Sequence, residues 1–250
     1  MTYIQKICYL LLLFHFWGMS SMAQNNDTRI KDVLYKVQAA YKNVAYLSFT
    51  VHYAYANRDN LIQPVDTMDG VVQMNGQRSH VSLSGIETLV TDQYSIQVLP
   101  QDKLLYVSSA PSPSVMDPVG SVDSVLPYLD KFRTSLTEEG GNDVLMIYFP
   151  TGGRFTQVRM MVDDKTGFLK EMVYSLSTSG LVTNDQLKAS GKGGAYQAQG
   201  QVSIRFSDYR RGAFGDSVFD LGNYLTKRDG HYVPSKSYDG YQIFWAKSPQ

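Results

Sequence analysis

Residues 27–44 carry apolar side chains at a helical spacing. The stripe consists of Ile30, Val33, Leu34, Val37, Tyr41 and Val44, at intervals of three and four. Most polar residues of the segment fall off this stripe, and Asn26 or Asp27 can cap the first turn. The pattern predicts an amphipathic helix packed on a sheet, and a helix lying on a membrane surface is the alternative.

From Leu47 the period changes to two. Apolar residues from Leu47 to Tyr55 alternate with small or polar ones, which predicts a strand of about ten residues with two unlike faces. After a polar loop at 57–64, short strands are expected near 67–74, 78–84, 87–91, 94–98 and 103–108. The turns between them are too short for a parallel crossover, so these strands should be antiparallel neighbours.

The second half of the chain repeats this organisation after an interruption. Three prolines between 110 and 120 predict a loop that leads into a short helix near 122–132. Strands follow at 133–137, 144–149, 155–162 and 168–176, and Val144–Phe149 is apolar on both faces, which predicts a central strand. A polar loop at 184–200, a long strand from Val202 and a last strand near 241–245 complete the pattern.

These elements predict an α+β, mainly antiparallel β fold. About ten strands in one sheet must twist, so we expect a single strongly curled sheet, a half-barrel. Helices should cover its concave face, and that face must be filled by helices, by its own side chains or by a ligand. The sequence shows no internal repeat and no clear boundary between domains.

The N-terminal segment resembles an export signal. Lys6 precedes an almost wholly apolar run from Ile7 to Trp17, and Ser21-Met22-Ala23 fits a small-x-small cleavage site near Ala23. The run is about 11 residues long, whereas a membrane-spanning helix needs roughly 20. We therefore predict a cleaved signal at 1–23 and a periplasmic protein, with a retained anchor as the alternative. Cys8, the one cysteine of the chain, lies in this signal, which excludes disulfides and thiolate catalysis from the remainder.

Charge and motifs exclude several kinds of chemistry. The chain holds 23 basic and 23 acidic residues, a balance that argues against nucleic-acid binding. His52, His80 and His231 are far apart in sequence and fit no metal-ligand spacing, so no metal or cofactor is expected. The acidic pairs at 138–139 and 163–164 are interpreted as turn residues, and Gly191–Gly194 as a connector that lacks the context of a phosphate loop. We predict that the protein is not an enzyme.

Several short motifs resemble the LolA/LolB family of periplasmic lipoprotein carriers. An amphipathic helix runs into Leu47–Val51, and a glycine-containing strand at Asp69–Met74 precedes a polar one. Leu89–Ile96 is similar to the family's "I-V-x-D-G" hairpin, with Gln93 in place of the glycine, and Asp163–Leu169 is similar to a later hairpin. Val202–Leu221 resembles its late strand with a trailing "V-F-D-L" segment, whereas residues 223–250 resemble nothing in the family.

The resemblance implies a lipid-binding half-barrel at 24–222, with 223–250 as a C-terminal extension packed on it. Such a protein would be a soluble monomer that binds acyl chains of lipoproteins or lipids in a hydrophobic cavity. Membrane-bound donor and acceptor proteins would load and unload it on the way to the outer membrane. The expected cavity residues are Phe49, Val51, Tyr53, Val72, Met74, Val81, Leu83, Ile96, Val98, Leu105, Val107, Met160 and Met172. Each of these also fits an ordinary sheet core.

Two other functions stay open at this point. The first is a non-enzymatic interaction or sensor module of the envelope, favoured by the aromatic residues Phe214, Phe219, Tyr224, Tyr232, Tyr238, Tyr241, Phe244 and Trp245. The second is a hydrolase or sugar-binding role that would use one of the three histidines.

Overall fold

The computed structural model describes residues 27–42, 44–108, 118–178, 195–212 and 214–246. The signal with Cys8 and its cleavage site, and Gly191–Gly194, lie outside the described residues. The first element of the described residues is a helix over residues 27–42. The first group of strands is β1 (Leu47–Asn57), β2 (Asp66–Asn75), β3 (Arg78–Leu83), β4 (Ile86–Val90), β5 (Ser95–Leu99) and β6 (Leu104–Ser108).

Two helical pieces separate these strands from the second group. They are α2 (Pro118–Val125) and the 3-10 helix η1 (Leu126–Lys131), which together form the predicted helical insertion. The strands that follow are β7 (Arg133–Glu138), β8 (Asn142–Tyr148), β9 (Phe155–Asp163), β10 (Leu169–Ser177) and β11 (Gln199–Arg211). The C-terminal part holds η3 (Asp216–Phe219), η4 (Leu221–Asn223), β12 (Leu225–Arg228), β13 (His231–Pro234), η5 (Lys236–Tyr238) and β14 (Gln242–Trp245).

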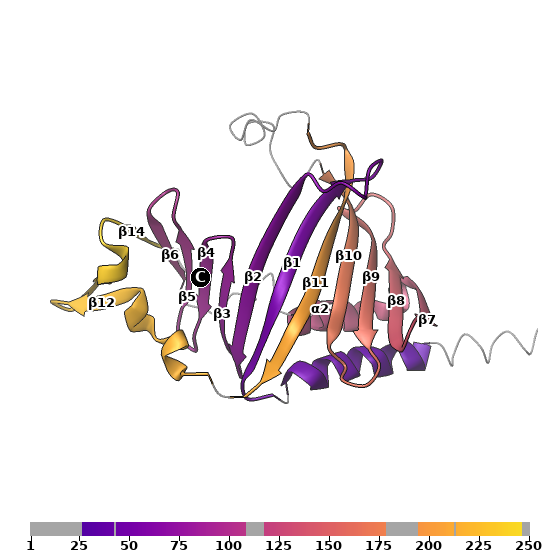
Figure 1. The fold of residues 1–250 in the computed structure, drawn as a ribbon, viewed down its shortest axis with the longest axis horizontal. Coiled ribbons are helices and arrows are strands. Elements are labelled where there is room, and N and C mark those ends of the chain that lie inside the picture. The colour runs from indigo at the N-terminus through magenta and orange to yellow at the C-terminus, as the bar shows by residue number, and fades with distance from the viewer. Residues whose placement is uncertain (1–26, 43, 109–117, 179–194, 213, 247–250) are drawn as a thin grey trace, which may run out of the picture.

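Twelve strands form one open sheet in the order β14-β6-β5-β4-β3-β2-β1-β11-β10-β9-β8-β7 (Figure 1). The prediction of a mainly antiparallel α+β fold is confirmed. The main sheet has twelve strands rather than about ten, and β12 and β13 form a separate two-stranded sheet. The strand predicted near 241–245 joins the main sheet as β14, parallel to β6. The prediction of a central position for Val144–Phe149 was wrong, since β8 is next to the edge strand β7.

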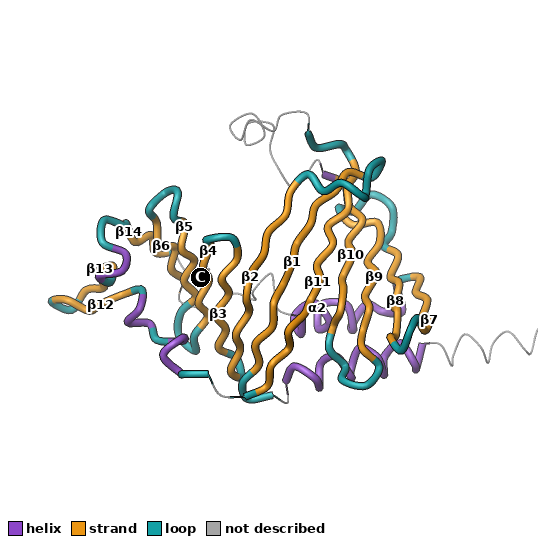
Figure 2. The backbone as a smooth tube through the Cα atoms, in the orientation of Figure 1, coloured by secondary structure: helices purple, strands orange, loops and turns teal. Residues whose placement is uncertain are grey.

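The sheet carries apolar layers on both faces. Residues that pair directly across two strands lie on the same face, and Phe49, Val72 and Val81 pair in turn across β1, β2 and β3. We call this the helix-side face, because these residues share one core cluster with Ile30 and Leu34 of the helix over residues 27–42. The helix and α2 lie on the same side of the sheet (Figure 2).

The second layer lies on the opposite, outer face. Leu89, Ile96 and Val107 pair in turn across β4, β5 and β6, and Leu89 pairs with His80 of β3, the neighbour in sequence of Val81. Successive strand residues point to opposite faces, so this row faces away from the helices. Its cover is the C-terminal part of the chain, which contributes Phe219, Tyr224 and Leu225 to a second buried cluster.

A ring of buried hydrogen bonds ties the helix over residues 27–42 to the sheet. The Leu169 N–H donates to the Tyr41 hydroxyl (3.3 Å), which lies 2.5 Å from the Tyr209 hydroxyl, and Tyr209 in turn donates to the Leu169 carbonyl (2.8 Å). Burial raises the pKa of both phenols, so both remain protonated donors at neutral pH. The ring fixes the end of the helix against β10 and β11.

Replacing Tyr209 by phenylalanine should lower the free energy of unfolding by about 1–3 kcal/mol. The change removes the Tyr209 oxygen to which the Tyr41 hydroxyl can donate, and it removes the donor to the Leu169 carbonyl. Urea denaturation measures the loss. Tyr35→Phe is the matched control, because Tyr35 is on the same helix and is 55% exposed. Equal stabilities of the two variants would contradict a role for the ring.

Candidate functional site

The structure separates the thirteen predicted cavity residues into two groups on opposite faces. Nine belong to, or pack against, the cluster on the helix-side face: Phe49, Val51, Tyr53, Val72, Met74, Val81, Leu83, Met160 and Met172. The other four, Ile96, Val98, Leu105 and Val107, belong to the cluster on the outer face, under the C-terminal part of the chain. The thirteen therefore do not line one common surface.

Most of the thirteen are packed by the protein's own side chains. Eleven are buried, and only Tyr53 and Met74 are half-buried. Phe49 and Val51 are 1% and 0% exposed and belong to the same core cluster as Ile30 and Leu34 of the helix, which are both 0% exposed. These residues form the core that holds the helix on the sheet, and a ligand that reached them would have to displace it.

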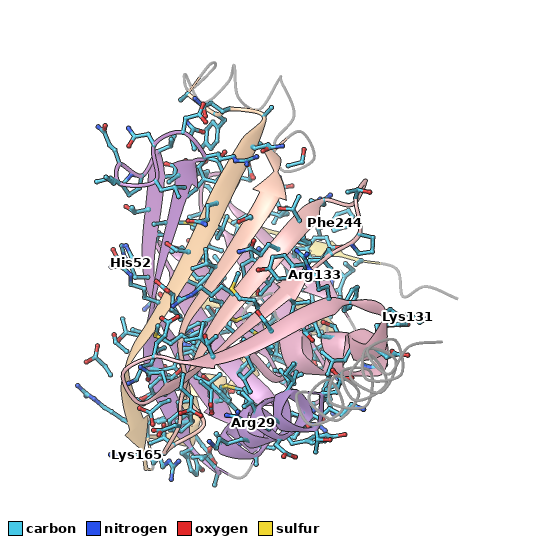
Figure 3. The ribbon with its side chains drawn as sticks, turned by 90° about the vertical axis from the view of Figure 1, so that its right-hand side faces the viewer. Arg29, His52, Lys131, Arg133, Lys165 and Phe244 are labelled. Atoms are coloured by element: carbon cyan, nitrogen blue, oxygen red, sulfur yellow. The ribbon has the colours of Figure 1, made fainter. Side chains whose placement is uncertain are left out.

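The apolar side chains that reach solvent on the helix-side face form a different set. Met68 pairs with Tyr53, Ile86 pairs with Leu83, and Phe244 pairs with Tyr106, so all of these share the face of the helices. We call the set the open apolar face; its members are Tyr53, Met68, Ile86, Leu99, Leu104, Tyr106, Phe149, Phe155, Tyr174 and Phe244. Figure 3 shows Phe244 on the side of the helices and His52 on the opposite side.

One end of the open apolar face is aromatic. Phe149 stands between Phe132 and Phe155, at ring-centroid distances of 5.0 and 6.3 Å, and Phe155 lies 5.6 Å from Tyr174. Tyr53 is near this group, and burial raises the pKa of its phenol, with a smaller contribution from Tyr174. The phenol is therefore uncharged at neutral pH, so this end of the face presents an uncharged apolar surface.

The other end of the open apolar face is formed by β4, β5, β6 and β14. Ile86 and Tyr106 are 38% and 39% exposed there, and Phe244 is 52% exposed and stacked on Tyr106 at 5.4 Å. Exposed apolar groups gathered on one face mark a binding surface rather than a core. Of the predicted set Tyr53 belongs to it, whereas Met74, half-buried at the other end of β2, packs against the core cluster. A sequence pattern shows which strand face is apolar but not how far the helices extend over it.

The polar candidates lie elsewhere. His52 Nδ1 is 2.6 Å from Asp69 Oδ1 on the outer face, and His80 Nε2 is 3.6 Å from Glu87 Oε2. Within the described ranges, no group of three or more His, Cys, Asp or Glu residues is arranged to hold a metal ion. A pocket of about 180 Å³ between β1, β2 and β11 is lined by Ser48, Phe49, Thr50, Val71, Asp208 and Arg210. That volume is below the range of roughly 300–1,000 Å³ typical of ligand pockets.

The acidic pairs lie where strands pass into turns, with Glu138 and Asp163 as the last residues of β7 and β9. Lys170 and the backbone N–H of Thr166 hold the pKa of Asp163 well below its usual range, and Asp163 closes the β9–β10 turn. Glu138 and Glu139 pair with Arg29 and Arg159 respectively. In the part of the chain that the structure describes, no helix is both long and apolar enough to cross a membrane.

No family model and no curated protein matches the chain. Among solved structures, it is similar to an uncharacterised conserved protein from Thermus thermophilus, with 12% identity over 87% of this chain and 99% of that one, and a TM-score of 0.48. It is also similar to a LolA superfamily protein from Nitrosomonas europaea, with 12% identity, coverage of 76% and 96%, and a TM-score of 0.35. The lipoprotein LppX from Mycobacterium tuberculosis gives 12% identity, coverage of 74% and 99%, and a TM-score of 0.38.

Proposed function

We propose that this chain is an exported envelope protein that binds acyl chains of lipoproteins or lipids and carries them towards the outer membrane without catalysis. Residues 24–222 would form the lipid-binding domain, with 223–250 packed on it as an extension. A donor and an acceptor protein in the two membranes would load and unload it. The periplasmic location rests on the predicted signal at residues 1–23.

The observation that carries the proposal is the open apolar face itself. This face borders the packed core, so a bound acyl chain would contact buried side chains on one side. The aromatic end of the face carries only uncharged rings. The twisted sheet would curve around the helices and shelter this face. An acyl chain of about 15 methylenes gains roughly 12 kcal/mol on leaving water, at ~0.8 kcal/mol per CH₂. Such a surface would shield one side of the acyl chain from water. Because the other side stays uncovered, the chain could still leave the protein.

The interaction-module alternative loses its main sequence support. Of the C-terminal aromatic residues, Phe219 and Tyr224 are buried in the outer cluster, and Phe214, Tyr232, Tyr238 and Tyr241 pack against it. These six side chains are engaged within the protein, whereas Phe244 and Trp245 are 52% and 40% exposed. We therefore develop the lipid-binding function alone.

A pair of substitutions on opposite faces tests the proposal. Ile86 of β4 and Val71 of β2 are 38% and 45% exposed, and they lie on the helix-side face and the outer face respectively. We expect Ile86→Glu to weaken the binding of a fluorescent fatty acid to delipidated protein by about tenfold, because the carboxylate must be desolvated when the chain binds. Val71→Glu should change the dissociation constant less than about twofold, since its surroundings stay in water.

Circular dichroism and thermal unfolding confirm that both variants are folded. No saturable binding by the folded parent protein would overturn the proposed function. Equal losses in the two variants would place the binding surface away from the open apolar face.

A further inference from the structure

A narrow aliphatic strip crosses the strands at one end of the open apolar face. Leu83 pairs with Ile86 across the β3–β4 turn, and Leu99 pairs with Leu104 across the β5–β6 turn. Glu87 pairs with Val98, so the preceding Ile86 lies beside Leu99. The four side chains, Leu83, Ile86, Leu99 and Leu104, therefore form one row perpendicular to the strands.

The strip is one side chain wide. On one side, Thr88 and Gln97 pair with each other in the next row of the same face. On the other side the strands end in turns at Ser84 and Lys103, residues with positive φ. A docking helix would bury a stripe at least about 100° wide, and an added strand would bind at a sheet edge rather than on a face. A single alkyl chain fits the width of the strip.

Both ends of the strip are defined. At the inner end, Leu83 is 7% exposed, and a Cβ added at Gly70 would lie 2.8 Å from Leu83 Cδ1, so the Leu83 side chain leans over Gly70. At the outer end, Leu104 pairs with the exposed Gln242 of β14. The hydrocarbon side chain of Leu83 therefore closes the inner end, whereas the outer end is polar and open to water.

The distance between these ends sets a chain length. From β3 to β14 the sheet advances by four strands, which is about 19 Å at about 4.8 Å per strand. An extended alkyl chain advances roughly 1.25 Å per carbon, from a bond of about 1.5 Å at a tetrahedral angle. The strip therefore accommodates about 15 carbons.

We propose that this strip binds one extended acyl chain of about 16 carbons, with its methyl end against Leu83 and its carboxyl or ester end at Gln242. The inference rests on the proposed function and names the cargo of that site as a single long chain. Cargo selection is then by length, because carbons beyond the outer end gain no contact.

A series of saturated fatty acids from 8 to 22 carbons tests the length, in competition with a fluorescent fatty acid on delipidated protein. Affinity should rise about twofold for each added methylene, since one side of the chain stays open to water. It should level off near 16 carbons. A rise that continues unbroken to 22 carbons would overturn the proposal.

Two variants locate the chain. Leu83→Ala should move the plateau to chains about four carbons longer, because it frees about one strand spacing over Gly70. Ile86→Glu should weaken the binding of a 16-carbon acid about tenfold, while Gln97→Glu, one row away on β5, should change it less than about twofold. A general loss of packing would not lengthen the preferred chain. An unmoved plateau in Leu83→Ala would refute the closed inner end.

These outcomes separate the strip from the proposed function. Fatty acids whose affinity rises unbroken to 22 carbons, with no change of length preference in Leu83→Ala, would overturn the strip and leave the carrier intact. A folded protein that binds no fatty acid of any length would overturn both.

Discussion

Replacing Gly167 by alanine is expected to lower the free energy of unfolding by about 3 kcal/mol or more. Gly167 closes the β9–β10 turn at φ +73°, a region that costs other residues roughly 1–2 kcal/mol. A Cβ there would also lie 2.8 Å from the Lys36 carbonyl oxygen and 3.1 Å from the Ala40 Cβ. Both atoms belong to the helix over residues 27–42, so the clash pushes the helix off the sheet.

The contacts around this turn show why the helix cannot simply move. Lys36 Nζ donates to the Asp164 carbonyl at 2.7 Å, and the rings of Tyr41 and Phe168 lie 5.3 Å apart. A shift of the helix would break these contacts and open the core cluster beneath it.

The variant Gly76→Ala separates the backbone strain from the clash with the helix. Gly76 has a φ of +61°, and no atom lies within 4 Å of an added Cβ. This variant should lose about 1–2 kcal/mol, the strain alone. Urea denaturation of both variants measures the difference, and equal losses would show that the turn does not support the helix.

The N-terminal helix and first strand were predictable because their patterns are local. The stripe from Ile30 to Tyr41 became the buried side of a helix at residues 27–42, and the alternation from Leu47 became β1 (Leu47–Asn57). Each pattern needs only one buried face, and that face is visible in the spacing of the residues themselves.

The assignment of apolar rows to faces failed between β3 and β4, although the sequence contains the information. Two residues, Ser84 and Gly85, connect Leu83 to Ile86, and residues that flank a two-residue turn pair with each other. Counting by twos from Ile86 places Thr88 and Val90 on the helix-side face and Leu89 on the outer face. The apolar rows of β5 and β6 then follow Leu89, so Ile96 and Leu105 cannot share a surface with Phe49.

Long-range pairings lay beyond the sequence pattern. β11 inserts between β1 and β10, and β14 adds to β6 in parallel. Periodicity describes each strand separately and does not specify which distant strand becomes its neighbour. The extent of the open apolar face was hidden for the same reason, since it depends on where the helices stop.

Deleting residues 223–250 should prevent the chain from folding stably. The segment provides Tyr224, Leu225 and much of the remaining cover of the outer cluster. Without it, Leu89, Ile96, Val98, Leu105 and Val107, which are at most 2% exposed, would face water. At roughly 1.5–3 kcal/mol for each side chain, the loss is about 7–15 kcal/mol, as large as the whole stability of a typical domain.

The deletion would also remove β14 and leave β6 as an unprotected edge, which favours aggregation. Size-exclusion chromatography and circular dichroism of the purified chain measure the outcome. A chain that ends at Ala246 is the control, since it retains every described contact and should behave as the parent.

The deletion therefore tests the integrity of the fold rather than the binding of a partner. Glu87 also joins β4 to the C-terminal segment, because its Oε2 accepts hydrogen bonds from Tyr224 (2.9 Å) and Tyr238 (3.2 Å). If the shortened chain were monomeric with an unchanged melting temperature, the outer layer would be a separable module. The aromatic residues of that segment would then again be available as a surface for an envelope partner.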